Sequence, residues 1–139
     1  MRWFSALFAL FLSVTGCDSP STETTDGNPS NTPSDIAMTE FAKRHSDGLQ
    51  LIDVRTTGEF QGGHIPGALN VPLASLTPGH PVLRSYDTTQ PIYIVCQSGG
   101  RSARAARALA RVGLTVINVK GGTSAWISQG HPVETTASQ

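Results

Sequence analysis

The stretch between residues 91 and 119 constrains the fold of this chain more than any other segment. Its two ends, residues 91–96 and 114–119, are runs of Ile and Val of the kind found in buried strands. Between them, residues 102–112 are rich in Ala, Leu and Arg, which favour a helix, and Gly113 follows where a C-terminal cap belongs. Strand, helix and strand joined by short links predict a parallel βαβ unit. We therefore expect an α/β fold, with a parallel β-sheet flanked by helices on both faces.

The remaining elements are shorter. Residues 38–45 predict a short amphipathic helix, and residues 49–54 and 68–71 predict two further strands. Proline and glycine break the stretch 74–90, which predicts short helical turns and loop. The chain has 139 residues, the usual size of a single domain, and no internal repeat is evident.

The N-terminus has the pattern of a targeting segment. Arg2 is followed by an apolar run of about a dozen residues, whereas a membrane-spanning helix needs about 20. Residues 14–17, Val-Thr-Gly-Cys, then resemble the lipobox of bacterial lipoproteins. This resemblance implies a signal peptide over residues 1–16 and a lipid on Cys17. The alternative is ordinary signal cleavage after residue 16. The lipoprotein interpretation predicts an extracytoplasmic protein anchored to a bacterial membrane on its periplasmic side.

The segment after this cysteine is polar. Residues 18–34 hold no apolar side chain apart from proline, so they cannot bury enough surface to offset the entropy of ordering. We expect residues 17–34 to be the lipidated cysteine and a disordered tether, residues 35–135 to be the folded domain, and residues 136–139 to be a tail. Such a tether would hold the domain near a membrane without embedding it.

Composition excludes several classes of function. Ten basic and ten acidic residues give a formal net charge of zero, which argues against charge-driven nucleic-acid binding. Two cysteines are too few for a disulfide scaffold or for most zinc sites. The four histidines are scattered without metal-ligand spacing. We therefore expect no metal, no cofactor and no nucleic-acid partner, and the sequence leaves the oligomeric state open.

The segment that follows the strand 91–96 carries the chemistry. Cys96 stands at the end of that strand, where ligand sites of parallel α/β folds lie. Adjacent glycines let several N–H groups point inward, and the helix N-terminus and Arg101 add positive charge. These effects favour a thiolate, so the pKa of Cys96 should fall below the roughly 8.5 of a free cysteine. The candidate catalytic residue is Cys96, and its expected substrate-binding cradle is Gln97, Ser98, Gly99, Gly100, Arg101 and Ser102. The alternative is a buried, inert cysteine beside a Gly-Gly turn.

Three motifs, in order, resemble those of single-domain rhodaneses. The first signature comprises Leu-Ile-Asp-Val-Arg at 51–55, Glu59-Phe60 and Gly-His-Ile-Pro-Gly-Ala at 63–68; the active-site loop spans 96–102; the C-terminal signature comprises Gly121-Gly122, Trp126 and Gly-His-Pro-Val at 130–133. The resemblance implies a sulfurtransferase. Sulfane sulfur would pass from a donor such as thiosulfate or a persulfide to Cys96, which becomes a persulfide, and then to a thiol or another thiophilic acceptor.

Two other functions compete with this one. Related cysteine phosphatases place five residues between the cysteine and the arginine, whereas four separate Cys96 from Arg101, so the smaller ring suits a sulfur atom. A non-catalytic rhodanese-like module that binds a protein partner or a sulfur species is the second alternative. The presence of Cys96 favours the enzyme. Gln97 and Ser98 are neutral, so only Arg101 and the loop amides would attract a dianion, and the sequence leaves open whether thiosulfate is a good substrate. We expect Arg101 to stabilise the thiolate and to orient an anionic donor.

Several other polar residues are expected to serve the scaffold. Arg55 could pair with Asp53 or with Glu59, and all three resemble structural residues of the family. His64 lies in a turn, and Trp126 is the expected core anchor of a final helix. A stripe of arginines at spacings of three and four predicts either a solvated helix face or a basic face for anionic partners: Arg101, Arg104, Arg107 and Arg111.

Overall fold

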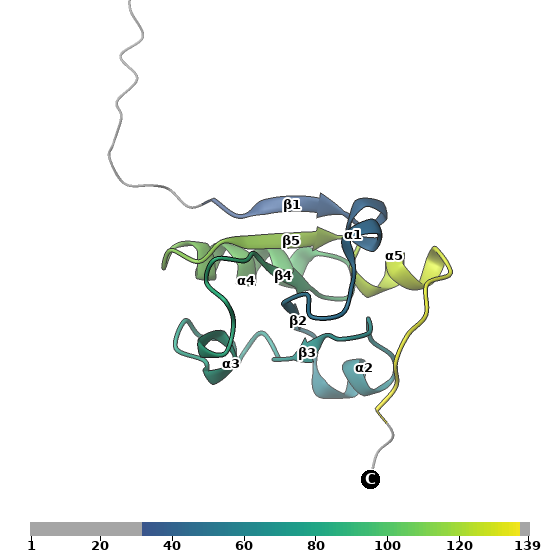
Figure 1. Ribbon diagram of the computed structural model, residues 1–139. Coiled ribbons are helices and arrows are strands. Elements are labelled where there is room, and N and C mark those ends of the chain that lie inside the picture. The colour runs from purple at the N-terminus through teal and green to yellow at the C-terminus, as the bar shows by residue number, and fades with distance from the viewer. Residues whose placement is uncertain (1–31, 137–139) are drawn as a thin grey trace, which may run out of the picture.

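The computed structural model describes residues 32–136, which form one parallel five-stranded sheet (Figure 1). The order across the sheet is β1-β5-β4-β2-β3. The strands are β1 (Ser34–Ala37), β2 (Leu51–Asp53), β3 (Leu69–Asn70), β4 (Ile92–Val95) and β5 (Val116–Lys120). The α/β fold class predicted from the βαβ unit is confirmed. Cys17, the expected signal peptide and all but the last few residues of the expected tether lie outside the described residues.

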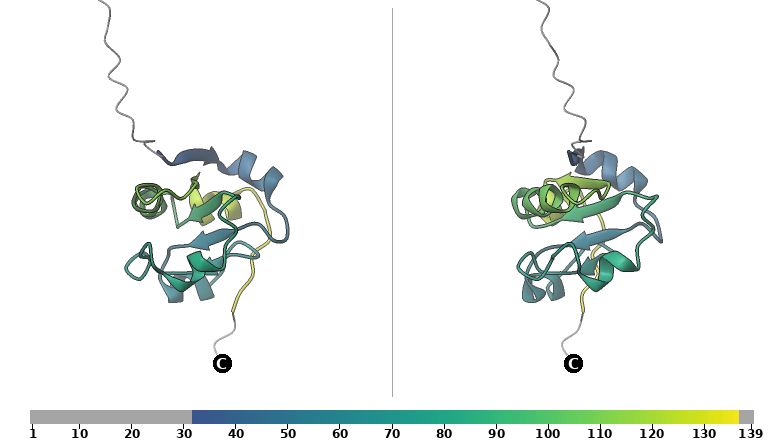
Figure 2. Two further views of the ribbon diagram at one scale, coloured as in Figure 1. Left: turned by 60° about the vertical axis from the view of Figure 1, so that its left-hand side comes forward. Right: turned by 90° about the vertical axis from the view of Figure 1, so that its left-hand side faces the viewer.

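Five helices connect the strands: α1 (Met38–Arg44), α2 (Thr57–Gln61), α3 (Pro81–Arg84), α4 (Gly100–Ala110) and α5 (Gly122–Ser128). Helix α1 and the short turn α3 lie where the sequence predicts them. Helix α4 begins at Gly100 rather than at Ser102, so Arg101 belongs to its first turn. Helices cover both faces of the sheet: Figure 2 shows α4, in green, and α1, in blue, on opposite sides.

Two elements have no clear signal in the sequence. Strand β1 starts at Ser34, inside the expected tether, and buries only Ile36, so it lacks the apolar pattern of a strand. Its order comes from pairing with β5 at the sheet edge. Helix α2 has only five residues and none is fully buried. It is stabilised by a capping box, in which Thr56 and Glu59 bond to each other's backbone N–H groups.

Alternation along β4 divides the core into two clusters. Ile92, Ile94 and Cys96 pack in the cluster that contains residues of α3 and α4. Tyr93 and Val95 pack in the opposite cluster, which contains residues of α1 and α5. The side chain of Cys96 therefore points toward the α4 side of the sheet.

The strand order places a ligand crevice between β2 and β4. From β2 the chain continues to β3 on one side, whereas from β4 it passes through α4 to β5 on the other side. In parallel sheets, ligands bind at such a switch point, outside the carboxyl ends of the two strands. The segments that leave β2 and β4 here contain Arg55 and Cys96 respectively. Among the helices between residues 32 and 136, none has the length and apolar character to cross a membrane.

Candidate active site

Cys96 lies immediately after β4 at the switch point, and its residue is only 1% exposed. Its Sγ accepts a hydrogen bond from the N–H of Gly99 at 3.1 Å and one from the hydroxyl of Ser102 at 3.4 Å. The same hydroxyl also donates to the carbonyl of Gly99 at 3.0 Å, so its proton is shared between two acceptors. The sulfur thus accepts hydrogen bonds from the loop and from the first turn of α4.

The environment of Cys96 lowers its pKa. Burial raises the pKa of the thiol, but the Ser102 hydroxyl and the backbone N–H groups of Ser102, Gly99 and Ser98 stabilise the thiolate and outweigh burial. The expected direction of the pKa is therefore found. A thiolate held among hydrogen-bond donors is a nucleophile that can take up an atom and keep its negative charge.

Glycine gives the loop its curvature. Gly99, the N-cap of α4, has a φ of +111°, a conformation that residues with a Cβ rarely adopt. This turn directs the N–H of Gly99 at the sulfur. A Cβ added to Gly99 would lie in van der Waals contact with the backbone N of Gly121, at the start of α5.

The first residues of α5 form hydrogen bonds with the loop that follows β4. The N–H of Thr123 donates to the carbonyl of Cys96 at 2.8 Å, and the N–H of Ser124 donates to the carbonyl of Gln97 at 3.1 Å. A Cβ on Gly122 would overlap both carbonyls, and Gly122 has a φ of +59°. These bonds turn two loop carbonyls toward α5, which leaves N–H groups facing the sulfur. In the sequence, this support is marked by the Gly121-Gly122 pair. Its contact with the Cys96 loop could not be predicted from local sequence patterns.

Gln97 is anchored by both ends of its amide. Its Nε2 donates to the hydroxyl of Ser124 at 2.6 Å, and its Oε1 accepts from Nη1 of Arg55 at 3.3 Å. The side chain therefore ties the loop to α5 and to the segment after β2. Of the predicted cradle residues, Ser98, Gly99 and Ser102 direct donors at the sulfur, whereas the Gln97 side chain does not.

Arg55 forms a buried ion pair with Asp53, which decides between its two predicted partners. Nη2 of Arg55 lies 2.7 Å from Oδ2 of Asp53, and both side chains are at most 4% exposed. Arg55 also donates to the carbonyl of Gly63 at 2.8 Å. The expected structural role of this pair is consistent with a network that joins β2, the segment after α2 and the Cys96 loop.

Glu59 pairs instead with Arg101, across the crevice from α2 to α4. Nη2 of Arg101 lies 2.6 Å from Oε1 of Glu59, and Nη1 lies 2.8 Å from Oε2. The hydrogen bond from Arg101 is the main cause of a pKa of Glu59 well below its usual range, and Glu59 raises the pKa of Arg101 in turn. Arg101 therefore bonds directly to a carboxylate at the crevice, and it also interacts electrostatically with Cys96. Its expected action on the thiolate stays a prediction.

An open groove of about 550 Å³ lies beside this ion pair. Thr56 and Arg101 line it at the crevice, and its other lining residues are mostly apolar. Two of these, Val54 and Ala105, belong to the same packed cluster as Cys96. The groove is therefore adjacent to the reactive loop.

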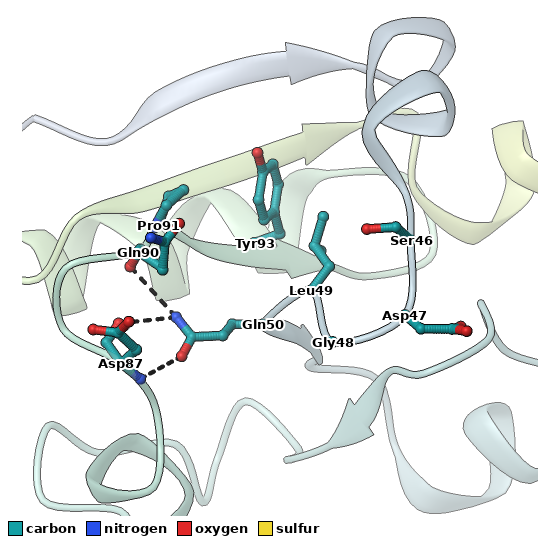
Figure 3. Close-up of a pocket in the computed structure, with 9 residues that line it drawn as sticks. All are labelled: Ser46, Asp47, Gly48, Leu49, Gln50, Asp87, Gln90, Pro91 and Tyr93. Carbon is teal, nitrogen blue, oxygen red and sulfur yellow. Dashed lines mark hydrogen bonds between the residues drawn. The ribbon is translucent and has the colours of Figure 1, made fainter.

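A second pocket, of about 400 Å³, lies at the opposite ends of the strands (Figure 3). It is formed near the amino-terminal ends of β2 and β4, away from Cys96. Gln50 spans it, with its amide nitrogen donating to the carbonyls of Asp87 and Gln90. These bonds connect two loops, and the pocket does not include the chemistry-bearing residues.

The other polar residues singled out in the sequence lie in the scaffold. His64 stacks on Phe60 and its Nδ1 lies 2.9 Å from the carbonyl of Phe60, as expected of a turn residue. Trp126 is 3% exposed and contacts Phe41, which confirms it as a core anchor. Three arginines of α4 and its C-terminus are solvent-exposed, namely Arg104, Arg107 and Arg111. Within residues 32–136, no group of His, Cys, Asp and Glu has the arrangement of a metal site.

Comparison with known proteins gives a consistent result. The family model described as "Rhodanese-like domain" matches residues 37–129. Thiosulfate sulfurtransferase 16, chloroplastic, of Arabidopsis thaliana is 36% identical over 115 residues, which cover 76% of this chain and 96% of that protein. Protein YqhL of Bacillus subtilis is 49% identical over 78 residues, and the match covers 55% of this chain but only 60% of that protein.

Solved structures agree with the fold. A rhodanese-like domain protein from Staphylococcus aureus superimposes with a TM-score of 0.64 at 33% sequence identity. The match covers 75% of this chain and 99% of the Staphylococcus protein. The described sheet and its helices therefore form one domain of known architecture.

Proposed function

The chain belongs to the rhodanese-like domain family, and from this premise we propose that it is a sulfurtransferase that carries sulfane sulfur on Cys96. The observation that supports the proposal is the position of Cys96 Sγ, buried at the switch point with hydrogen bonds from Gly99 and Ser102. The same donors that lower the pKa of the thiol can stabilise the persulfide anion after sulfur uptake.

In the first half of the reaction, the Cys96 thiolate attacks the outer sulfur of a donor. A bond forms between Sγ and that sulfur, and the donor's own bond to it breaks. The electron pair of the broken bond leaves with the donor, as sulfite from thiosulfate or as a thiolate from a persulfide. The loop N–H groups remain in place and bind the terminal sulfur of the new persulfide.

In the second half, a thiol or another thiophilic acceptor attacks the terminal sulfur of the Cys96 persulfide. The acceptor–sulfur bond forms, the S–S bond to Sγ breaks, and its electron pair returns to Cys96 as the thiolate. The donor is a small sulfur-containing molecule, the acceptor is a thiol or another thiophilic molecule, and no external oxidant or reductant is needed.

Replacement of Cys96 by serine tests this function. The two side chains are nearly isosteric, so we expect Cys96→Ser to keep the fold and to lose transfer from a sulfane donor to cyanide. The measurement is thiocyanate production, with circular dichroism as the control for folding. Transfer retained by the variant would overturn the mechanism, and absence of transfer by a folded parent would favour the non-catalytic binding module.

We also propose that a lipid on Cys17 holds the domain at the periplasmic side of a bacterial membrane. The support is the signal-like apolar run and the residues Val-Thr-Gly-Cys at 14–17. A Cys17→Ala variant is expected in the soluble extracytoplasmic fraction, whereas the parent sediments with membranes. If both sediment with membranes, the lipid anchor is excluded.

A further inference from the structure

We propose that the Glu59–Arg101 ion pair selects against dianionic donors, so that the site takes an organic sulfane-sulfur compound with at most one negative charge in preference to thiosulfate. This inference rests on the proposed sulfurtransferase function and specifies its substrate class. It assigns Glu59 the role of a specificity-determining residue.

Two arginine side chains lie at the loop that follows Cys96. Arg101 lies in the first turn of α4, and both of its terminal nitrogens bond to the carboxylate of Glu59, at 2.6 Å and 2.8 Å. Arg55, the other arginine whose side chain contacts the loop, is paired with Asp53 at 2.7 Å. A carboxylate therefore compensates each of the two cations. Because Coulomb energy depends on the sum over all charges, a dianion approaching the loop gains little from either arginine. Arg104 also lines the adjacent groove, but it is exposed, so solvent and salt screen its charge.

The Glu59 carboxylate, which compensates the charge of Arg101, is held in place without any bound donor. Oε2 of Glu59 accepts hydrogen bonds from the N–H of Thr56 at 2.9 Å and from its hydroxyl at 2.8 Å. These bonds belong to the capping box of α2. An incoming donor cannot displace Glu59 without also breaking this cap, so the compensation of Arg101 is a fixed property of the site.

The groove of about 550 Å³ beside the ion pair offers a place for an organic group. Arg101 and Thr56 line it on the side of the loop, and Val54 and Ala105 connect it to the cluster that contains Cys96. Thiosulfate has no apolar part that could use this surface. A donor whose outer sulfur reaches Cys96 could place its apolar substituent in the groove.

The test replaces Glu59 by glutamine, which removes the charge and keeps a residue type that can complete a capping box. The donors are thiosulfate, a dianion, and methanethiosulfonate, a monoanion that transfers the same kind of sulfur. Coulomb energy is proportional to the charge of the donor. The fold-increase in kcat/KM for the dianion should therefore be the square of the fold-increase for the monoanion. We expect kcat/KM in Glu59→Gln to rise about ten-fold for thiosulfate and about three-fold for methanethiosulfonate.

Glu40→Gln is the matched control, because Glu40 lies on α1 and forms ion pairs with Lys43 and Arg44 of the same helix. It should leave both rates unchanged. A second measurement uses the parent alone. Its kcat/KM for thiosulfate should depend only weakly on ionic strength, since salt screens mainly uncompensated charges. The parent should also use benzenethiosulfonate better than methanethiosulfonate, because only the former fills the groove.

The outcomes separate this inference from the proposed function. If the parent transfers sulfur but Glu59→Gln changes kcat/KM for both donors by the same factor or not at all, the proposed charge selectivity is wrong and the proposed sulfurtransferase function stands. A steep fall in thiosulfate use by the parent with added salt would also overturn the selectivity, even if the variant failed to fold. If the parent takes sulfur from none of the donors, the proposed function itself fails.

Discussion

At the scale of single residues, hydrogen bonds rather than a neighbouring cation decide the state of the Cys96 sulfur. The residue is 1% exposed, and burial alone would favour the neutral thiol. The Ser102 hydroxyl and three backbone N–H groups reverse that preference. Since these donors are built into the loop and the first turn of α4, the thiolate does not depend on a mobile side chain.

Removing one donor should raise the pKa of Cys96. Ser102→Ala eliminates the hydroxyl that lies 3.4 Å from Sγ and leaves the backbone N–H groups in place. The thiolate form then becomes populated only at higher pH, so the pH profile of alkylation of Cys96 should shift toward alkaline values. The rate of reaction with iodoacetamide as a function of pH measures this shift.

Ser98→Ala is the control, because Ser98 is exposed and acts on the sulfur through its backbone N–H. Its pH profile should coincide with that of the parent. A Ser102→Ala profile identical to both would show that the hydroxyl has no part in stabilising the thiolate.

The residues of the loop differ in how far the sequence predicts them. Cys96 and the adjacent glycines could be assigned because strand, turn and helix follow one another locally. The partner of Arg101 could not, since Glu59 is 42 residues away and only the tertiary fold brings α2 and the first turn of α4 together. For the same reason, the side-chain bonds of Gln97 to Ser124 and Arg55 could not be predicted, and the sequence indicated only that Gln97 belongs to the cradle of the loop.

At the scale of elements, the reactive loop depends on α5 as much as on β4 and α4. The first N–H groups of α5 bind the carbonyls of Cys96 and Gln97. Gly122 permits this contact, because a Cβ at that position would overlap the two carbonyls. The support of the loop therefore comes from a helix that follows it by some twenty residues.

Gly122→Ala should displace the loop and destabilise the domain. The positive φ and the overlap together should lower the free energy of unfolding by about 2–4 kcal/mol. The loss of the N–H ring should also raise the pKa of Cys96. Urea denaturation measures the first effect and iodoacetamide titration measures the second.

Gly113→Ala is the matched control. Gly113 also has a positive φ, of +89°, but a Cβ there has no atom within 4 Å. It should cost about 1 kcal/mol and leave the thiol titration unchanged. Equal effects of the two substitutions on both measurements would contradict the role of α5.

Elements also show the limits of local patterns. The βαβ unit was predictable because β4, α4 and β5 each bury an apolar face over several residues. Strand β1 buries only Ile36, and α2 buries no residue fully, so neither segment has a periodic pattern of apolar residues in its sequence. Their structure comes from edge pairing and from a cap.

At the scale of the whole molecule, the residues after α5 form hydrogen bonds both with α5 and with the segment that precedes β3. The N–H and carbonyl of Glu134 form two hydrogen bonds of 2.9 Å with those of His64, in the segment that precedes β3. The indole N–H of Trp126 donates to the carbonyl of Pro132 at 2.6 Å. The C-terminal segment thus connects α5 to the β2–β3 side of the crevice.

Truncation after Gly130 should therefore destabilise the domain. The truncation removes these three hydrogen bonds and a fourth, from the N–H of His131 to the carbonyl of Trp126. Their loss predicts a free energy of unfolding lower by about 2–4 kcal/mol, measured by urea denaturation. Glu134→Gln keeps the two backbone bonds and removes only a half-exposed charge near His64, so it should change stability by less than about 0.5 kcal/mol. A truncated chain as stable as the parent would show that the segment contributes nothing to the fold.

The intact mass of the protein shows directly whether Cys96 takes up one sulfur atom. After incubation with a sulfane donor and removal of the excess, the parent should gain the mass of one sulfur atom, located on the peptide that contains Cys96. Addition of cyanide or a thiol should return the original mass, and Cys96→Ser should gain nothing. A parent whose mass stays unchanged, or an equal gain by Cys96→Ser, would contradict the account.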